Sequence, residues 1–397
     1  MTIEPDLSPE VAAANGLRTG WTTGTCASAA AKAAALQLVI GPRPNEIEVG
    51  LPDGRRVRFP VEEPDPPVDA GLDTGETTAS SSSSGPVGSA AVIKDAGDDP
   101  DCTDGAWITA VVTARSEAAD PTGLDTGDGD PASEPVWLAG GDGVGTVTRP
   151  GLGLTVGGPA INPVPARMIR AAIAEVTDDP VVCTISVPGG RTMAEKTSNA
   201  RLGIEGGISI LGTTGVVKPF STASYRASVV QQIDVAAAQE VDAVVLATGS
   251  RSDRWAQAHW PERLPVQFVE VGDFTGIALR RAAGAGITGV DFVGMAGKIT
   301  KLAAGVMMTH FHRSKVDVDL LEEVATGAGA PDAVVAAATE TNTARHFFEA
   351  CMANDSIAPL EELCRRAASR CAEHAGDGLD VRVIMVDFEG EREVCRG

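Results

Sequence analysis

The chain has 397 residues, enough for two ordinary domains, and 43% of them are hydrophobic, which indicates a globular protein. The net charge of -22 excludes nucleic acid as a main partner, because phosphates would repel so acidic a surface. The sequence has no apolar run of membrane-spanning length and no basic, apolar leader at its start, so we expect no membrane partner and a cytoplasmic location.

The acidity has two explanations that the sequence leaves open. Only seven of the 32 basic residues are lysine. A high-salt cytoplasm would screen the repulsion between so many carboxylates. A high-GC genome that favours Arg, Ala, Gly and Asp codons would give the same composition.

The cysteines and histidines predict neither a disulfide framework nor a metal site. The seven cysteines form no CxxC pair. Cys364 and Cys371 are seven apart in a helical pattern, so we expect them to pack on one buried helix face. His310 and His312 form the one close histidine pair, and no third ligand lies near them in the sequence.

The first half of the chain predicts a domain of mixed helices and strands. Thr22 and Thr23 precede an alanine-rich helix over 26–40, which Gly41 and Pro42 end. Strands are expected over 46–51 and 55–61, joined by a hairpin turn at Asp53-Gly54. Further along, we expect strands of one sheet over 89–94, 106–114 and 136–138, a helix from near Pro165, and a buried strand over 181–187.

Two low-complexity stretches interrupt this domain, over 62–87 and 116–134. They are rich in Ser, Gly, Asp and Pro and cannot bury enough apolar surface to offset the entropy of ordering. We expect both to be long solvated loops.

The second half alternates apolar strands with helices. After a helix from Ser221 to about Glu240, strands are expected over 242–247, 266–271 and 290–293, with helices between them. This pattern predicts an α+β domain over 1–205, followed by a Rossmann-like α/β domain with a mostly parallel sheet over 206–397. The loops that follow these strands should share one cleft, because ligands of open parallel sheets bind at the carboxyl ends of the strands.

The segment from Gly206 to Ser221, GGISILGTTGVVKPFS, permits two interpretations. A glycine-threonine turn between a strand and a helix is typical of a loop that holds phosphate or a nucleotide. It is equally typical of the tight connection that α/β packing needs.

Five segments, in order along the chain, together resemble the CbiD family of cobalamin biosynthesis, the cobalt-precorrin-5B (C1)-methyltransferases. They are LRTGWTTGTCASAAAKAA (17–34), VIKDAGDDPDCTDG (92–105), GGDGVGTVTRPGLGLTVGGPAINPVP (140–165), GGISILGTTG (206–215) and GMAGKITKLAAG (294–305). The resemblance extends from Gly16 to about Val324. It implies transfer of a methyl group from S-adenosylmethionine to C1 of a cobalt-containing corrinoid precursor, giving cobalt-precorrin-6A in the anaerobic route.

This chain departs from the family pattern at two places. Family members commonly have Asp-Val-Thr-His-Gly where this chain has Asp101-Cys102-Thr103-Asp104-Gly105, so Asp104 stands in place of a histidine. Many members have Thr-Gly-Asn-Arg-Gly-Glu where this chain runs from Thr248 to Asp253 as TGSRSD.

Methyl transfer from a sulfonium needs alignment of donor and acceptor more than a nucleophilic side chain. A carboxylate could take up a proton as the macrocycle rearranges, and Asp95, Asp98 and Asp99 are the candidates. The alternative is that these carboxylates only bond nearby backbone N–H groups in a turn.

The substrate implied by the resemblance carries many carboxylates, so its pocket needs cations and N–H donors. Lysine is scarce in the chain, yet four of the seven lie in the motifs, and three of these are candidates here. The candidate substrate-binding residues are Thr22, Thr23, Thr25, Lys94, Arg149, Arg167, Arg170, Lys298 and Lys301. The threonines precede a helix and could hold a carboxylate there or serve only as a helix cap.

S-adenosylmethionine is the expected co-substrate, and cobalt is expected only as part of the substrate. By the logic of Rossmann-type sheets, an acidic residue after the second strand would bind the ribose, and Gly-rich loops would lie beneath the cofactor. The candidates are Gly212, Thr213, Thr214, Gly215, Thr248, Gly249, Glu270, Asp273 and Gly294.

We therefore predict a two-domain methyltransferase with its active site between the domains, and a homo-oligomer is possible. Two other functions share these loops. One is a non-catalytic carrier of a nucleotide or tetrapyrrole, and the other is an enzyme of the same fold whose loops bind the phosphate of a nucleotide.

Overall fold

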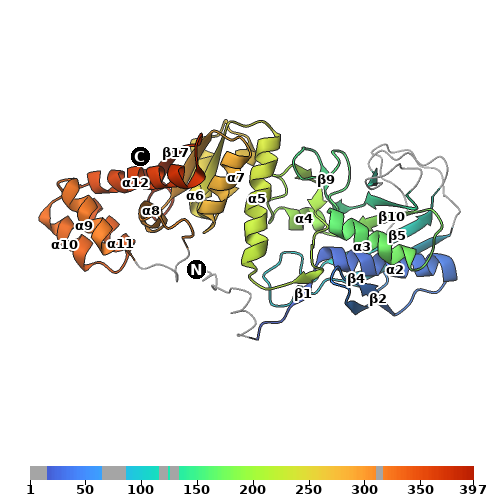
Figure 1. The fold of residues 1–397 in the computed structure, drawn as a ribbon. Coiled ribbons are helices and arrows are strands. Elements are labelled where there is room, and N and C mark those ends of the chain that lie inside the picture. Colours follow the sequence, from blue (N-terminus) through green and yellow to red (C-terminus); the bar gives the residue numbers. More distant parts are fainter. Residues whose placement is uncertain (1–15, 65–85, 116–123, 126–133, 310–315) are drawn as a thin grey trace. The chain divides into compact units, whose positions relative to one another are not determined.

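The computed structural model of the chain describes residues 16–64, 86–115, 124–125, 134–309 and 316–397. It forms two compact units, Met1–Thr222 (unit 1) and Ala223–Gly397 (unit 2), which are coloured blue to green and yellow to red in Figure 1. The predicted loops 62–87 and 116–134 lie almost wholly outside the described residues, and His310 and His312 also lie outside them. Within the described ranges, no helix combines the length and the apolar character that crossing a membrane requires.

Unit 1 is built on a mixed five-stranded sheet. Its order is β4-β5-β10-β7-β6, with β10 antiparallel to β5 and parallel to β7. The three strands predicted to share one sheet do so, and the predicted strand over 181–187 joins them. The bounds are β4 (Val87–Ile93), β5 (Trp107–Ala114), β6 (Leu124–Asp125), β7 (Val136–Gly140) and β10 (Val181–Ser186).

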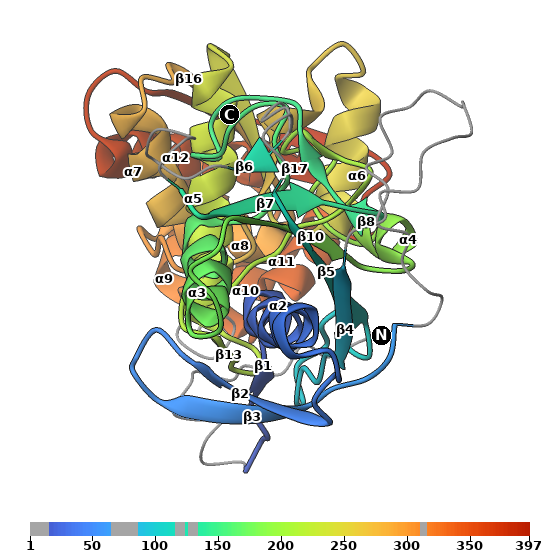
Figure 2. The same ribbon diagram turned by 90° about the vertical axis from the view of Figure 1, so that its right-hand side faces the viewer.

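One face of this sheet is covered by two helices that lie side by side, α2 (Thr23–Ile40) and α3 (Pro163–Ala174), as Figure 2 shows. Helix α2 confirms the alanine-rich prediction but begins three residues earlier, because Thr22 caps it. Helix α3 begins at Pro163 rather than Pro165, with proline in its first turn as expected.

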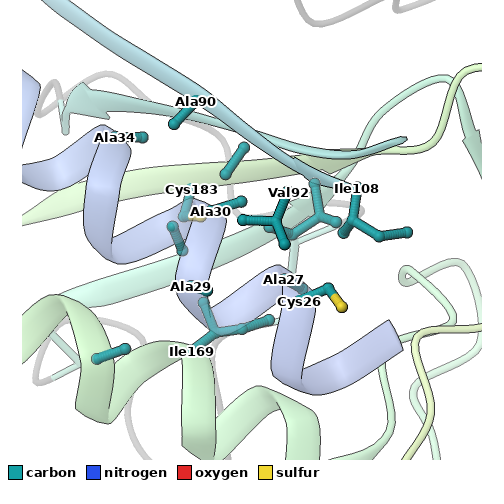
Figure 3. Packing of buried hydrophobic residues seen from close by; sticks show 14 of the residues in the cluster. Cys26, Ala27, Ala29, Ala30, Ala34, Ala90, Val92, Ile108, Ile169 and Cys183 are labelled. Carbon is teal, nitrogen blue, oxygen red and sulfur yellow. The ribbon is translucent and has the colours of Figure 1, made fainter. Parts of the chain in front are cut away.

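Small side chains let α2 lie very close to its neighbours. Its alanines and Cys26 are fully buried. Figure 3 shows them between Ile169 of α3 and residues of three strands: Ala90, Val92, Ile108 and Cys183. The core of unit 1 is therefore centred on this helix.

The hairpin predicted around Asp53-Gly54 is present. Strand β2 (Glu46–Gly50) pairs antiparallel with β3 (Arg56–Pro60), and the Asp53 carboxylate accepts the N–H of Arg55 at 3.0 Å. Phe59 of this hairpin meets Trp21 edge to face, with ring centroids 5.3 Å apart. The hairpin thus packs onto the segment that precedes α2.

Short strand pairs close the rest of unit 1, and they move the boundary between the two domains. Strand β12 pairs with β8, and β13 pairs with β1, so residues 206–222 belong to unit 1. They were expected in the second domain, because their pairing partners lie far away in the sequence. The short elements are β1 (Gly20–Trp21), β8 (Gly143–Val144), β9 (Thr146–Val147), α4 (Gly190–Ala194), β11 (Ile204–Glu205), β12 (Gly207–Ile208) and β13 (Val216–Val217).

Unit 2 contains a second five-stranded sheet, of order β15-β14-β16-β17-β18. The first four strands are parallel and β18 is antiparallel to β17. The predicted strand over 266–271 is shorter than expected, because Val266 lies in a 3-10 turn, η1 (Pro265–Gln267). The other elements of this part are α5 (Thr222–Ala238), β14 (Ala243–Ala247), α6 (Ser250–His259), β15 (Phe268–Glu270), α7 (Thr275–Gly284), β16 (Gly289–Gly294) and α8 (Ala296–Ala303).

In the described part of the chain, five helices, α8 and then α9 to α12, separate β16 from the last two strands of this sheet. On the last of these helices, Cys364 and Cys371 are both buried, as their spacing predicted, and all seven cysteines are free thiols. The elements are α9 (Val318–Gly327), α10 (Asp332–Glu340), α11 (Ala344–Ala353), α12 (Ala358–Ala375), β17 (Asp380–Val386) and β18 (Glu393–Arg396).

Candidate active site

The residues that follow β4, 95–105, form a loop that we call the acidic loop. Carboxylates of the loop itself stabilise its conformation by accepting backbone N–H groups. Asp95 accepts the N–H of Gly97 at 2.9 Å, and Asp104 accepts the N–H of Ala96 at 2.8 Å. The side chain that replaces the histidine of the family pattern thus closes the two ends of the loop on each other.

Lys94 and Asp101 form an ion pair at the base of the acidic loop. Lys94 is 2% exposed, and its ammonium lies 2.6 Å from Asp101 Oδ2. Asp101 Oδ1 accepts both the N–H and the hydroxyl of Thr103, at 2.7 and 2.6 Å. Burial alone would raise the pKa of Asp101, but the hydrogen bonds from Lys94 and Thr103 outweigh it and hold that pKa below its usual value. Lys94, predicted to bind substrate, is part of this buried pair, and its contact with substrate stays a prediction.

Arg18 binds two of the three predicted catalytic carboxylates. Its guanidinium pairs with Asp95, and its backbone N–H donates to Asp98 Oδ2 at 2.6 Å. The hydrogen bond from Arg18, followed by that from Gly97, lowers the pKa of Asp95. A carboxylate with a lowered pKa is a weaker base, so Asp95 is poorly suited to accept a proton.

Asp99 differs from its neighbours. It is half-buried, and this burial raises its pKa, although the N–H of Phe220 donates to its Oδ1 at 2.9 Å. Phe220 has a φ of 53°, a left-handed conformation that bulky residues seldom adopt. The contact joins the acidic loop to the segment that follows the glycine-threonine turn, 121 residues away in the sequence.

The glycine-threonine turn packs on the N-terminus of α2, and the short strand β13 separates it from α5, which follows. Gly24 N–H donates to Leu211 O at 2.9 Å, and the Thr25 hydroxyl donates to Gly215 O at 2.7 Å. Thr22 Oγ1 accepts the N–H of Thr25 as the helix cap, and Thr23 Oγ1 accepts the N–H of Leu211 at 2.7 Å. The cap interpretation of these buried threonines is therefore confirmed, and a contact with substrate remains a prediction.

Gly212 is required by this packing. Its φ is 132°, and a Cβ placed on it would lie 2.3 Å from Thr22 Oγ1. Thr213 and Thr214 beside it are exposed, and the Thr214 hydroxyl donates to Val216 O at 3.0 Å. The close approach that glycine permits here is to α2.

We expect Gly212→Ala to lower the free energy of unfolding by about 1–3 kcal/mol, because the added methyl group would overlap Thr22. Gly249→Ala is the matched control: its φ is 163°, and a Cβ there would meet no atom within 4 Å. It should change the stability by less than about 0.5 kcal/mol. Urea unfolding of the two variants measures both values, and equal stability would refute the structural role of Gly212.

Of the three arginines predicted to bind substrate in unit 1, Arg167 and Arg170 lie on α3 and Arg149 lies outside it. Arg167 is exposed on α3 and forms no ion pair with any residue that the structure describes. Arg170, three residues along, donates to Val136 O at 3.3 Å. Arg149 is half-buried and lies against Gly203.

In unit 2, the loops after β14, β15 and β16 converge on one side chain. Lys298, in α8 just after β16, donates to Thr248 O at 3.0 Å and to Gly272 O at 2.9 Å. Its ammonium also lies 3.3 Å from Asp273 Oδ1. The three loops thus meet at Lys298, a predicted substrate-binding residue, and the prediction that they share a ligand cleft stays a prediction.

The other predicted cofactor residues of unit 2 lie at the same carboxyl edge. Glu270 ends β15, and its carbonyl accepts the hydroxyl of Tyr225 at 3.3 Å. Gly294 ends β16. Asp273 also accepts the Thr309 hydroxyl at 3.1 Å, so it is already bound to two side chains.

Lys301 lies one turn beyond Lys298 and donates to Thr309 O at 3.0 Å. Burial lowers the pKa of Lys301, although the nearby Asp273 opposes this effect.

The backbone of the turn that opens α6 is open to its surroundings. Ser252 Oγ accepts the N–H groups of Thr248 and Gly249, at 3.0 and 3.2 Å, which orders this turn. Cβ atoms placed on Gly249 and on Gly297 would meet nothing within 4 Å. Among the described residues, no three His, Cys, Asp or Glu side chains are grouped to hold a metal ion.

Two protein-family models match the chain. The model described as CbiD covers residues 10–219, and the model described as CbiD, C-terminal domain, covers residues 308–394. The chain therefore belongs to the CbiD family.

Curated relatives match over nearly the whole length of both chains. A cobalt-precorrin-5B C(1)-methyltransferase from Salinispora tropica is 53% identical, over 99% of this chain and 96% of its own. A protein of the same name from Rubrobacter xylanophilus is 50% identical, over 97% of this chain and 93% of its own. A crystal structure of the cobalamin biosynthesis protein cbiD from Archaeoglobus fulgidus is 27% identical, over 74% of this chain and 82% of its own, with a TM-score of 0.37.

Several residues that complete these sites were not among the predicted ones. Two of them contact predicted carboxylates: Arg18 binds Asp95, and Phe220 binds Asp99. The other two are Asp101, which pairs with Lys94, and Thr309, which donates to Asp273. Asp101 and Arg18 lie inside motifs that resemble the family, so the sequence marked both residues but did not indicate what they contact. Nothing in the sequence marked Phe220 or Thr309, because the residues they contact are distant in the sequence.

Proposed function

We propose that this chain transfers a methyl group from S-adenosylmethionine to C1 of cobalt-precorrin-5B, giving cobalt-precorrin-6A. The observation that carries the proposal is 53% identity, over 99% of the chain, to a curated cobalt-precorrin-5B C(1)-methyltransferase. In this proposal cobalt is part of the substrate. A cytoplasmic location and a homo-oligomer remain predictions.

We place S-adenosylmethionine at the carboxyl edge of the unit 2 sheet, which we regard as Rossmann-like. The strand order supports this position: the chain runs from β14 to β15 on one side and then to β16 on the other, and ligands of open parallel sheets bind at such a reversal. The space beside Gly249 and Gly297 admits a ligand close to the backbone. Glu270, at the end of β15, would accept hydrogen bonds from the ribose hydroxyls.

When bound, S-adenosylmethionine supplies the methyl group, and the protein has to align donor and acceptor. Because the donor is a sulfonium, a proton leaves when a neutral acceptor is methylated. We assign this proton to Asp99, because its pKa is raised whereas that of Asp95 is lowered. Arg167, exposed and without an ion pair among the described residues, is our candidate for binding a substrate carboxylate.

The direct test is to incubate the purified protein with cobalt-precorrin-5B and S-adenosylmethionine labelled in its methyl group. We expect label in the corrinoid. Binding of both compounds without transfer would favour a carrier. Competition between inorganic phosphate and S-adenosylmethionine would favour an enzyme that acts on a nucleotide.

For the cofactor position, we expect Glu270→Ala to raise the Kd for S-adenosylhomocysteine about 10-fold or more, because hydrogen bonds to a charged group are lost. Isothermal titration calorimetry measures this Kd. Glu262→Ala, at an exposed position of the same unit, is the control and should leave the Kd unchanged. An unchanged Kd in Glu270→Ala would reject Glu270 as the ribose ligand.

A further inference from the structure

We propose that Lys298 is a positioning residue, whose ammonium fixes the loops that hold S-adenosylmethionine. The inference rests on the function proposed above and assigns a role to a residue that sequence motifs had pointed toward the corrinoid. Its basis is the set of three contacts that Lys298 makes with Thr248 O, Gly272 O and Asp273 Oδ1.

These contacts join parts of the sheet that the chain itself leaves apart. Thr248 follows β14, Gly272 follows β15, and Lys298 lies just after β16. Between Thr248 and Gly272 the chain runs through α6 and η1, so no short covalent link sets the distance between the two loops. The pairing of β14 with β15 brings the two strand ends together, and Lys298 ties the first residues beyond that pairing to each other and to α8.

The chemistry of an ammonium suits this task. Thr248 and Gly272 lie just past the last paired residues of their strands, so their carbonyls need partners from outside the sheet. A lysine ammonium has three N–H donors, and here it has three acceptors within 3.3 Å. Asp273 also balances its charge. A bond from Lys298 to a substrate carboxylate would compete with these contacts.

The position of Lys298 relates it to the cofactor site. Gly249, with open space where a side chain would be, is the residue after Thr248, and Glu270 precedes Gly272 by two residues. A shift of either loop would move a group that we propose to contact the cofactor. A misplacement of about 1 Å can cost an enzyme about 100-fold in rate.

The test compares Lys298→Met with Lys32→Met in the full chain. Lys32, in unit 1, also binds one backbone carbonyl and one carboxylate, those of Glu48 and Glu175, and it reports the cost of losing a purely structural lysine. We expect Lys298→Met to raise the Kd for S-adenosylhomocysteine and the KM for S-adenosylmethionine about 10- to 100-fold, with the KM for the corrinoid unchanged. Lys32→Met should lower the thermal midpoint and leave both KM values unchanged.

Lys298→Arg carries the test if Lys298→Met does not fold. Arginine keeps the positive charge, but its planar guanidinium cannot reproduce all the contacts of the ammonium. The Kd of Lys298→Arg for S-adenosylhomocysteine should therefore fall between those of the wild type and Lys298→Met. Wild-type affinity in the folded variants, or a rise in the KM for the corrinoid alone, would overturn the inference. If the wild-type chain itself fails to bind S-adenosylhomocysteine, the proposed function is what fails.

Discussion

Replacing Asp99 with asparagine should lower kcat about 100-fold or more, the usual size of a general-base contribution. The amide oxygen of the introduced asparagine can still accept the N–H of Phe220, so the contact that orders the loop is kept while the proton acceptor is lost. Single-turnover measurements with labelled S-adenosylmethionine would isolate the chemical step from product release. The thermal midpoint should stay close to that of the wild type.

Two comparisons make this result decisive. Asp98→Asn should cost far less, because Asp98 is exposed and bound to the backbone N–H of Arg18. In the wild type, kcat/KM should rise with pH as Asp99 ionises, with a midpoint above the ordinary aspartate pKa of 3.8, because burial raises its pKa. An Asp99→Asn enzyme with wild-type kcat would show that water or another group takes the proton.

The largest effect on stability should come from breaking the buried pair of Lys94 and Asp101. Asp101→Asn leaves the Lys94 charge almost without solvent and without a countercharge, which should cost about 3–5 kcal/mol in the free energy of unfolding. Urea unfolding measures it. Glu46→Gln, which removes an exposed ion pair with Arg58, is the control and should not move the midpoint measurably.

The same pair predicts how stability depends on pH. The pKa of Asp101 is lower in the folded chain than its ordinary value of 3.8, so its contribution is fully present above that value. It is lost as the pH falls through the folded pKa. The wild-type stability should therefore decrease on acidification below about pH 4, and Asp101→Asn should decrease less. Parallel pH profiles for the two proteins would contradict this assignment.

The parts of the fold that local sequence determines could be predicted. The turn at Asp53-Gly54 and the cap at Thr22 depend on residues within a few positions of each other. Strand β17 was missed because five helices of the described chain separate it in sequence from its neighbour β16. The domain boundary was misplaced for the same reason, since β12 and β13 pair with strands much earlier in the chain.

The candidate site was predictable in its residue types but not in its contacts. The motifs marked Asp95, Asp99 and Lys298, yet only the fold shows that Arg18 lowers the pKa of the first and that three loops converge on the last. The glycine-threonine turn is the clearest case. Its spacing is typical of a ligand loop, whereas its Gly215 carbonyl is bound by Thr25, which lies 190 residues earlier in the first turn of α2.

The alanines of α2 have a consequence for conformational entropy. An alanine side chain has no rotamers, so burying it costs no side-chain entropy, whereas each buried Leu or Ile costs about 0.5–1 kcal/mol. The interface between α2 and the sheet therefore forms with little loss of side-chain entropy and has few alternative packings. The first turn of this helix donates hydrogen bonds to Leu211 O and Gly215 O, so the rigid packing of α2 also fixes the position of residues 211–215. Larger side chains on the buried face of α2 should disturb the segment from a distance, so relatives are expected to keep this face small.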